Sequence, residues 1–316
     1  MRILLIILLT IPSIAFLKNE EDTNLNHDDV LTLIDSSLNY IRKSGIIGIN
    51  SMAYLKFTYE TSHRFFTTYH YSPFIFKNDI AYSMVMDKAF HLYLSTIISS
   101  VNYHLYRGAG FNKKNAIILT ATNTMLIGFT KEWIDAHIDV GGFSWIDMLS
   151  NMVGVGGALY QEHLWNHQKI IFKYSYRDSP WAQYNPSELG ANQFTRMFRD
   201  YNAITFWMST PLSTFINIHS DRSNLGWKDI VSISFGYGVN GMLSQKDNTS
   251  IELLHGLEEI FRIREYTLAL DLHLSNIPTK SKVLKNLFFV LDHIKIPLPS
   301  IQYSSDRNLK FYAFYI

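Results

Sequence analysis

The sequence predicts an α+β fold, in which a helical bundle is followed by a small antiparallel sheet. Two observations carry this prediction. Between residues 79 and 165, long apolar segments are separated by short glycine-containing links, as between neighbouring helices of a bundle. Beyond residue 165, apolar and polar residues alternate over stretches of about ten residues, as they do along strands. With 316 residues, of which 47% are hydrophobic, the chain is long enough to bury a full core.

Three main helices are expected, and each has a start or stop signal. The first spans about 79–107, is apolar on all sides, and is followed by two glycines. The second spans about 112–138, with Asn112 as its N-cap. The third spans about 144–165, where Ser144 precedes an acidic residue by three positions, the spacing of a capping box. Because the links are short, the natural packing is an up-down-up bundle.

The amino terminus has the features of an export signal. In residues 1–15, Arg2 precedes an apolar run and small residues before a cleavage position. An uncleaved anchor is the alternative, but roughly nine apolar residues are few beside the about 20 that a bilayer span needs. Residues 16–29 are acidic and are expected to form a flexible mature terminus. A helix is expected at 30–42, and an irregular, aromatic-rich connection at 61–73.

The mature chain is therefore divided into a helical domain, 30–165, and a β-rich domain, 166–316, that is expected to lie next to a membrane. The clearest alternation covers 231–240 and 266–275. Soluble and lipid-embedded antiparallel strands share this pattern, so it does not place the sheet in lipid. An amphipathic helix with lysines near its start is expected at about 281–293, lying on a membrane surface or covering the sheet. Further expected elements are strands at 170–176, 301–303 and 310–316 and a short helix at 190–200.

Composition excludes several classes of function. Lys and Arg number 28 and Asp and Glu 27, and a formal net charge of +1 argues against nucleic acid as a partner. The chain has no Cys, which excludes disulfides and a lipid-modified cysteine. It also lacks a nucleophile elbow, a phosphate-binding loop and a dinucleotide fingerprint. No cofactor is expected, and whether a metal binds is left open.

Polar residues recur at helical spacing inside the three predicted helices. A buried charge costs several kcal/mol unless it finds a partner, so we expect these groups to meet in space. Asp87 and His91 lie four residues apart on one helix face, where a carboxylate can orient an imidazole and raise its basicity. We call the candidate site residues the central polar set: Asp87, His91, Glu132, Asp135, Asp147 and Asn151.

Each part of the central polar set also has a plainer interpretation. The Asp87–His91 pair is equally explained as a simple ion pair. The Glu132–Asp135 pair can share a proton, hold a cation or accept hydrogen bonds, or it can pair with the lysine that precedes it. Asp147 can be a first-turn residue favoured by the helix dipole.

Three motifs carry a resemblance to a known family: Asp87-Lys88-x-x-His91, Lys131-Glu132-x-x-Asp135, and Gly142-Phe143-Ser144-Trp145-x-Asp147-x-x-x-Asn151-x-x-Gly154. They resemble the uncharacterised YfiM-type predicted outer-membrane lipoproteins and, more distantly, the VanZ-like membrane proteins. The resemblance covers about residues 87–165 and implies a cell-envelope protein with a helical polar centre, without an established reaction. The chain departs from the lipoprotein members because it has no Cys to lipidate.

Two functions are compatible with the sequence. In the first, an envelope protein of the periplasm or outer membrane contacts lipid or other envelope proteins, and its central polar set holds the helices in register. In the second, Asp87 and His91 form an oriented base, with or without a metal, that acts on a lipid or cell-wall intermediate. The sequence favours the first and leaves the oligomeric state undetermined.

Overall fold

The computed structural model describes residues 27–216 and 225–315. The export signal predicted at residues 1–15 and most of the predicted flexible terminus at 16–29 lie outside this part of the chain. The α+β class is confirmed, with helices first and a six-stranded antiparallel sheet after them. None of the helices within the described ranges combines the length and the apolarity needed to span a bilayer. The long helices are α2 (His27–Thr68), α3 (Met86–Gly108), α4 (Lys113–Asp135) and α5 (Trp145–Trp165).

The chain forms two compact units that interleave along the sequence. The first holds residues up to Phe76 and Ile98–Phe143, and the second holds Lys77–Ile97 and Ser144–Ile316. The sequence predicts a domain boundary at residue 165, whereas this grouping places α5 and the first half of α3 with the sheet. Aromatic packing joins the first half of α3 to the sheet, because the rings of Phe90 and Tyr93 lie 5.9 and 5.5 Å from that of Phe206 in the sheet.

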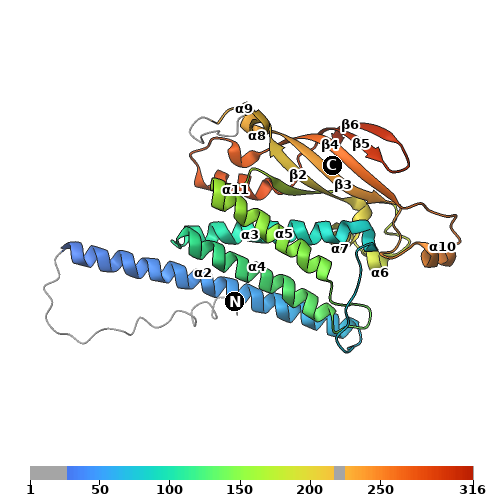
Figure 1. The fold of residues 1–316 in the computed structure, drawn as a ribbon, viewed down its shortest axis with the longest axis horizontal. Helices are drawn as coiled ribbons and strands as arrows, with labels where there is room; N and C mark the ends of the chain where they lie inside the picture. Colours follow the sequence, from blue (N-terminus) through green and yellow to red (C-terminus); the bar gives the residue numbers. More distant parts are fainter. Residues whose placement is uncertain (1–26, 217–224, 316) are drawn as a thin grey trace. The chain divides into compact units, whose positions relative to one another are not determined.

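In the first unit, α2 and α4 run side by side (Figure 1). Two polar contacts join them: the Tyr54 and Thr130 hydroxyls are 2.8 Å apart, and Asn123 donates to Asn50 Oδ1 at 3.1 Å. The prediction of an irregular connection at 61–73 is wrong as far as Thr68, because α2 continues to that residue. Aromatic residues four apart pack along the helix there, as Tyr59 and His63 do at 5.8 Å.

The predicted start of the first main helix at residue 79 is also wrong. A short 3-10 turn, Tyr82–Val85, precedes α3, which begins at Met86. Ser83, Met84 and Val85 have φ values of 50°, 51° and 73°, a left-handed conformation that interrupts the helix. The buried Met84 is held there by the hydroxyl of Tyr237, which donates to its carbonyl at 2.5 Å. Tertiary contacts therefore override the apolar pattern.

The other helix starts follow the predicted caps. Asn112 accepts a hydrogen bond from the Asn115 amide at 2.8 Å, and Ser144 accepts one from the Asp147 amide at 3.1 Å. Each cap satisfies an amide that the first helical turn leaves without a partner. The helices α4 and α5 consequently begin within one residue of the positions that the sequence predicts.

The second unit is built on a sheet in which each strand pairs with the next along the chain, in the order β1-β2-β3-β4-β5-β6. The strand β2 is not among the predicted elements, because four consecutive buried residues at its start hide the alternation. The strands are β1 (Ile171–Tyr176), β2 (Ile204–Pro211), β3 (Val231–Asn240), β4 (Ile263–Leu272), β5 (Leu298–Ser304) and β6 (Leu309–Tyr315). The shorter helices are α6 (Pro186–Leu189), α7 (Gln193–Arg199), α8 (Ser213–Ile216), α9 (Trp227–Ile230), α10 (Thr249–His255) and α11 (Lys282–Leu291).

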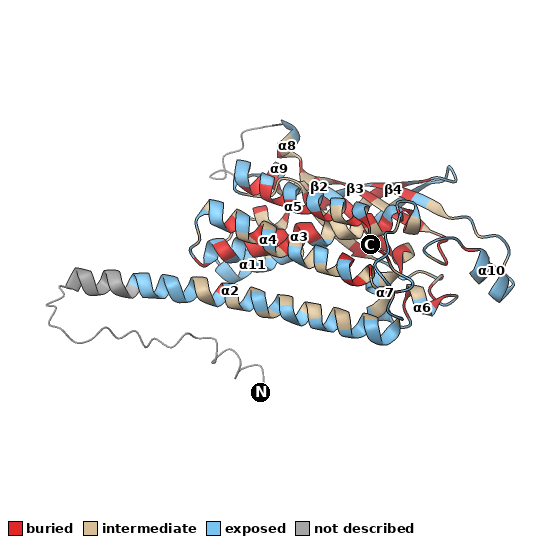
Figure 2. Cartoon of the chain, turned by 60° about the horizontal axis from the view of Figure 1, so that its bottom comes forward, coloured by how far each residue is buried: buried red, intermediate tan, exposed pale blue. Residues whose placement is uncertain are grey.

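The core of this unit lies between the start of α3 and the strands β1, β2 and β3. Figure 2 shows buried residues along the strands and exposed or half-buried residues along most of α2. The buried apolar side chains of this core include Met84, Met86, Leu189, Ile204, Phe206, Val239 and Met242.

The helix α5 approaches α3 closely at Gly154. A methyl group at this position would lie 2.1 Å from Ser95 Oγ and 2.6 Å from the Leu92 carbonyl oxygen. We expect Gly154→Ala to lower the free energy of unfolding by about 1–3 kcal/mol, because the helices must move apart. A methyl group at Gly157 on the same helix would meet no described atom within 4 Å. Because alanine favours a helix more than glycine does, Gly157→Ala should raise the free energy of unfolding by up to about 1 kcal/mol. Urea unfolding of both variants checks this; equal effects would contradict the close contact.

Candidate functional site

Two helices of the second unit carry the polar centre. Asp87, Lys88 and His91 lie on the first turns of α3, and Asp147 and Asn151 lie on the first turns of α5. Residues four apart on a helix share a face, so each helix presents its polar groups to the same point. Four of the six residues of the central polar set thus come together: Asp87, His91, Asp147 and Asn151.

Lys88 is the centre of this cluster. Its side chain is 5% exposed, and its Nζ lies 2.8 Å from Asp79 Oδ2, 2.8 Å from Asp147 Oδ1 and 3.2 Å from Asp87 Oδ2. Ser144 supports the arrangement by donating to Asp79 Oδ1 at 2.8 Å. Burial by itself lowers the pKa of Lys88, but the three carboxylates outweigh it and the net pKa is raised. The ammonium group therefore stays charged at neutral pH.

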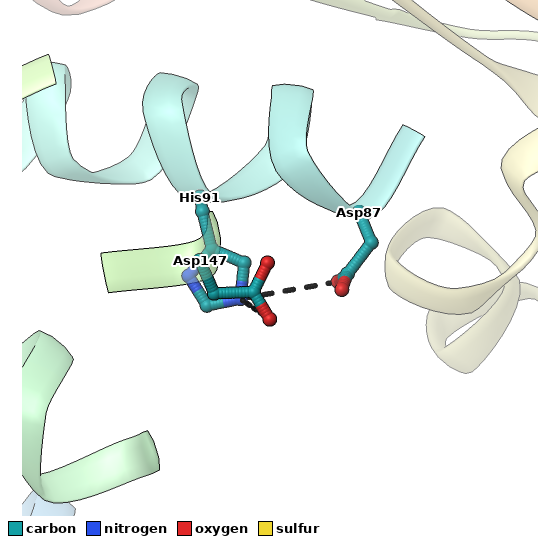
Figure 3. A group of neighbouring side chains, drawn as sticks. All are labelled: Asp87, His91 and Asp147. Carbon is teal, nitrogen blue, oxygen red and sulfur yellow. Dashed lines mark ion pairs between the residues drawn. The ribbon is translucent and has the colours of Figure 1, made fainter. Parts of the chain in front are cut away.

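The Nε2 edge of the His91 ring faces the carboxylates of Asp87 and Asp147 (Figure 3). Its Nδ1 is 3.2 Å from Asn151 Oδ1, within hydrogen-bonding distance. Its Nε2 is 3.7 Å from Asp147 Oδ2 and 3.9 Å from Asp87 Oδ1, too far for a direct hydrogen bond. The Asp87 side chain is 26% exposed and that of His91 is 11% exposed, so the centre is accessible from the Asp87 side.

Glu132 and Asp135 belong to the first compact unit. Lys131 Nζ lies 3.0 Å from Glu132 Oε1 and 2.8 Å from Asp135 Oδ2. This geometry matches the plainer interpretation, in which the two carboxylates pair with the lysine that precedes them. Glu132 is fully buried and Lys131 is partly exposed. Lys131, Glu132 and Asp135 therefore form an ion-paired cluster in the last turns of α4.

Sequence reasoning missed three members of the cluster. The sequence does indicate Lys88, because a cation next to Asp87 inside an apolar helix needs a buried partner. Asp79 lies outside any helix, and Tyr201, which donates to Asp87 Oδ1 at 3.1 Å, is more than 100 residues away along the chain. Only the fold brings Asp79 and Tyr201 to the centre.

The fold and the site together define an α+β protein with a lysine-centred polar cluster between two helices. Residues 76–163 match the model of a family described as a predicted periplasmic lipoprotein family (DUF2279). The match covers well under half of the 316 residues but includes α3, α4 and nearly all of α5, and with them the whole central polar set. The family description agrees with the predicted export, and it names the periplasm, one of the two locations expected from the sequence.

Comparison with curated proteins and with solved structures gave no match. The narrower resemblance to the YfiM-type and VanZ-like proteins stays a prediction. The absence of Cys in this chain remains a departure from a family described as lipoproteins.

Proposed function

We propose that this is an exported cell-envelope protein that lies against a lipid surface, and that its polar centre is architectural. The observation that carries the proposal is a row of large apolar side chains across the sheet. Cross-strand pairing links them in the order Met208, Phe235, Leu268, Ile301 and Phe311, from β2 to β6. Their exposed fractions run from 45% to 70%. A continuous exposed apolar surface of this kind is typical of a membrane or partner contact.

The opposite face of the same sheet supports this proposal because it is polar and buried. Ser234 donates to Asp271 Oδ2 at 2.8 Å, and Gln302 donates to Glu265 Oε2 at 3.0 Å, all within the interior. A sheet of a water-soluble protein ordinarily buries its apolar face and exposes its polar one. The reversed arrangement is favourable where the outer face meets lipid rather than water.

The helix α11 supports a lipid surface that carries negative charge. Lys280, Lys282 and Lys285 lie at its start, with no acidic residue before its end. Val283 and Val290 on this helix are 75% and 58% exposed, so the sheet does not cover its apolar side. A basic helix with an open apolar side binds anionic bilayers by combining charge attraction with burial of apolar area.

The polar centre fits an architectural role because its lysine is ion-paired with three carboxylates. Lys88 is buried against three carboxylates, two on segments other than its own helix. A buried charge set of this kind penalises any other register of α3 against α5, because a shift would leave a buried charge without its partner.

Vesicle binding tests the lipid proposal. We expect the full chain to bind vesicles containing phosphatidylglycerol, and Leu268→Asp to weaken this binding at least tenfold, because a carboxylate in the middle of the apolar row resists desolvation. The matched control is Leu253→Asp on α10, where the leucine is 78% exposed but lies outside the sheet. Co-sedimentation measures the bound fraction.

The outcomes separate lipid from a protein partner. Binding that weakens in Leu268→Asp and not in Leu253→Asp supports the sheet surface. Equal weakening in both variants would reject the apolar row as the lipid-binding surface, because each variant adds a negative charge. No binding of the wild type to anionic vesicles would reject lipid as the occupant and leave the apolar row as a protein-binding surface.

A further inference from the structure

Carboxylates outnumber ammonium groups in the described ion pairs next to His91. Asp79, Asp87 and Asp147 supply three carboxylates against the one ammonium group of Lys88, which leaves two net negative charges when His91 is neutral. Asp147 is 3% exposed, so solvent screens little of this charge. An excess of buried negative charge is stabilised by a cation or by protons.

In both carboxylates, the oxygen that contacts Lys88 differs from the oxygen nearest to His91. Lys88 takes Asp87 Oδ2 and Asp147 Oδ1, at 3.2 and 2.8 Å. The other oxygen of each carboxylate, Asp87 Oδ1 and Asp147 Oδ2, is the one nearest to His91 Nε2. Tyr201 donates to Asp87 Oδ1 at 3.1 Å and Lys88 contacts Oδ2, so the two residues together orient this carboxylate.

The imidazole has the orientation of a metal ligand. When Nδ1 of His91 carries the proton and donates to Asn151 Oδ1, Nε2 keeps a lone pair directed at the two carboxylates. Histidine ligands commonly have such a partner on the other ring nitrogen, which fixes the tautomer. Asn151 is buried, and its Nδ2 has no hydrogen-bond partner among the described residues, so its contact with His91 is made through Oδ1.

We propose that Asp87 Oδ1, His91 Nε2 and Asp147 Oδ2 bind one divalent cation of the first transition row, such as Zn²⁺. Each of the three residues offers one ligand atom, and these atoms lie within 4.8 Å of one another. The separations of 3.7 and 3.9 Å from Nε2 fit two ligand atoms that each lie about 2.0–2.2 Å from a shared ion. One imidazole with two carboxylates suits Zn²⁺ or Mn²⁺, with water in the remaining positions.

Lys88 opposes the cation and Asp79 offsets this effect. The ammonium group shares both ligand carboxylates, which lowers affinity for a second cation. Asp79 lies 2.8 Å from Lys88 Nζ and neutralises its charge. The negative charges of Asp87 and Asp147 therefore remain able to attract a metal ion. The partly exposed Asp87 gives the ion a route from solvent.

Calorimetry with ZnCl₂ on the chelator-treated full chain tests the proposal. We expect one Zn²⁺ per chain in the highest-affinity class and at least tenfold weaker binding in His91→Asn, because the only nitrogen ligand is lost. The matched control is His255→Asn on α10, whose ring contacts the Tyr184 carbonyl at 2.8 Å and should not affect this class. Circular dichroism confirms that each variant is folded.

A second measurement uses the wild type, so it tests the proposal even if His91→Asn fails to fold. A crystal grown with Zn²⁺ should show an anomalous peak about 2.0–2.2 Å from His91 Nε2. Asp87→Asn, at the partly exposed edge, should weaken binding in calorimetry. Anomalous peaks only at other histidines, or unchanged affinity in His91→Asn, would overturn the proposal. Loss of vesicle binding leaves it standing, because lipid contacts lie elsewhere in the second unit.

Discussion

Replacing Lys88 by methionine is expected to lower the free energy of unfolding by about 3–5 kcal/mol, because it leaves buried carboxylates without their cation. Methionine keeps most of the length of the side chain, so the loss reports charge rather than a cavity. Asp79 and Asp147 are both buried, and each loses a contact of 2.8 Å. Urea unfolding at pH 7, followed by circular dichroism, measures the change.

The pH of this experiment lies inside the range where Lys88 stabilises the fold. Its folded-state pKa is raised above the ordinary value of 10.5, so its contribution is fully present below that value and is lost only as the pH rises through the raised pKa. The matched control is Lys56→Met, whose ammonium group is 3.6 Å from Glu60 on the exposed side of α2. An exposed pair of this kind contributes less than about 1 kcal/mol.

Two outcomes would count against the architectural role. A loss of less than about 1 kcal/mol in Lys88→Met would mean that the carboxylates find other partners or protons at little cost. A loss equal to that of Lys56→Met would mean that burial of the cluster has no energetic consequence. If the cation site exists, Zn²⁺ should raise the melting temperature of Lys88→Met more than that of the wild type, because the competing charge is gone.

Local signals in the sequence were sufficient for the starts of α4 and α5 and for part of the polar centre. The caps at Asn112 and Ser144 are local chemistry, and spacing of four places Asp87 with His91 on one face. The positions of Asp79 and Tyr201 depend on how distant segments pack, which no local pattern records. The same holds for the start of α3, where burial of the preceding 3-10 turn decides the backbone conformation.

The sheet shows a different limit. Alternation along β3 and β4 predicts strands, and both are present. A period of two, however, says only that the two faces differ, not which one is buried. Here Ser234 and Asp271 point inward while Phe235 and Leu268 are exposed, the reverse of the usual assignment. The buried partners of Asp271 come from β1 and from the segment after α11, so they too are set by the fold.

The largest effect in the sheet is expected from Asp271→Asn. Asp271 is fully buried, with Lys173 Nζ at 3.1 Å from Oδ2 and Lys295 Nζ at 3.7 Å from Oδ1. Burial by itself raises the pKa of Asp271, but the two lysines and Ser234 outweigh it and lower the pKa below its ordinary value. Removing the charge leaves two buried ammonium groups, so the free energy of unfolding should fall by about 3–5 kcal/mol at pH 7.

The pH dependence of this loss identifies its cause. Burial lowers the pKa of Lys295 to about 8, from 10.5 in the unfolded chain. The unfolded state therefore binds more protons between pH 8 and 10.5, and the stability contributed through Lys295 rises across that window. Without Asp271 the pKa of Lys295 falls further, so the deficit of Asp271→Asn relative to wild type should be smaller at about pH 9 than at about pH 6.

Lys295→Met is the matched control in the same network. It should cost less than Asp271→Asn, because Asp271 keeps Lys173 and the 2.8 Å hydrogen bond from Ser234. It should also remove the rise in stability between pH 8 and 10.5, since the group that titrates there is gone. Urea unfolding of the two variants and the wild type at pH 6, 7 and 9 gives the comparison. A deficit in Asp271→Asn that is independent of pH would place the loss in packing or hydrogen bonding instead of in the two buried ammonium groups.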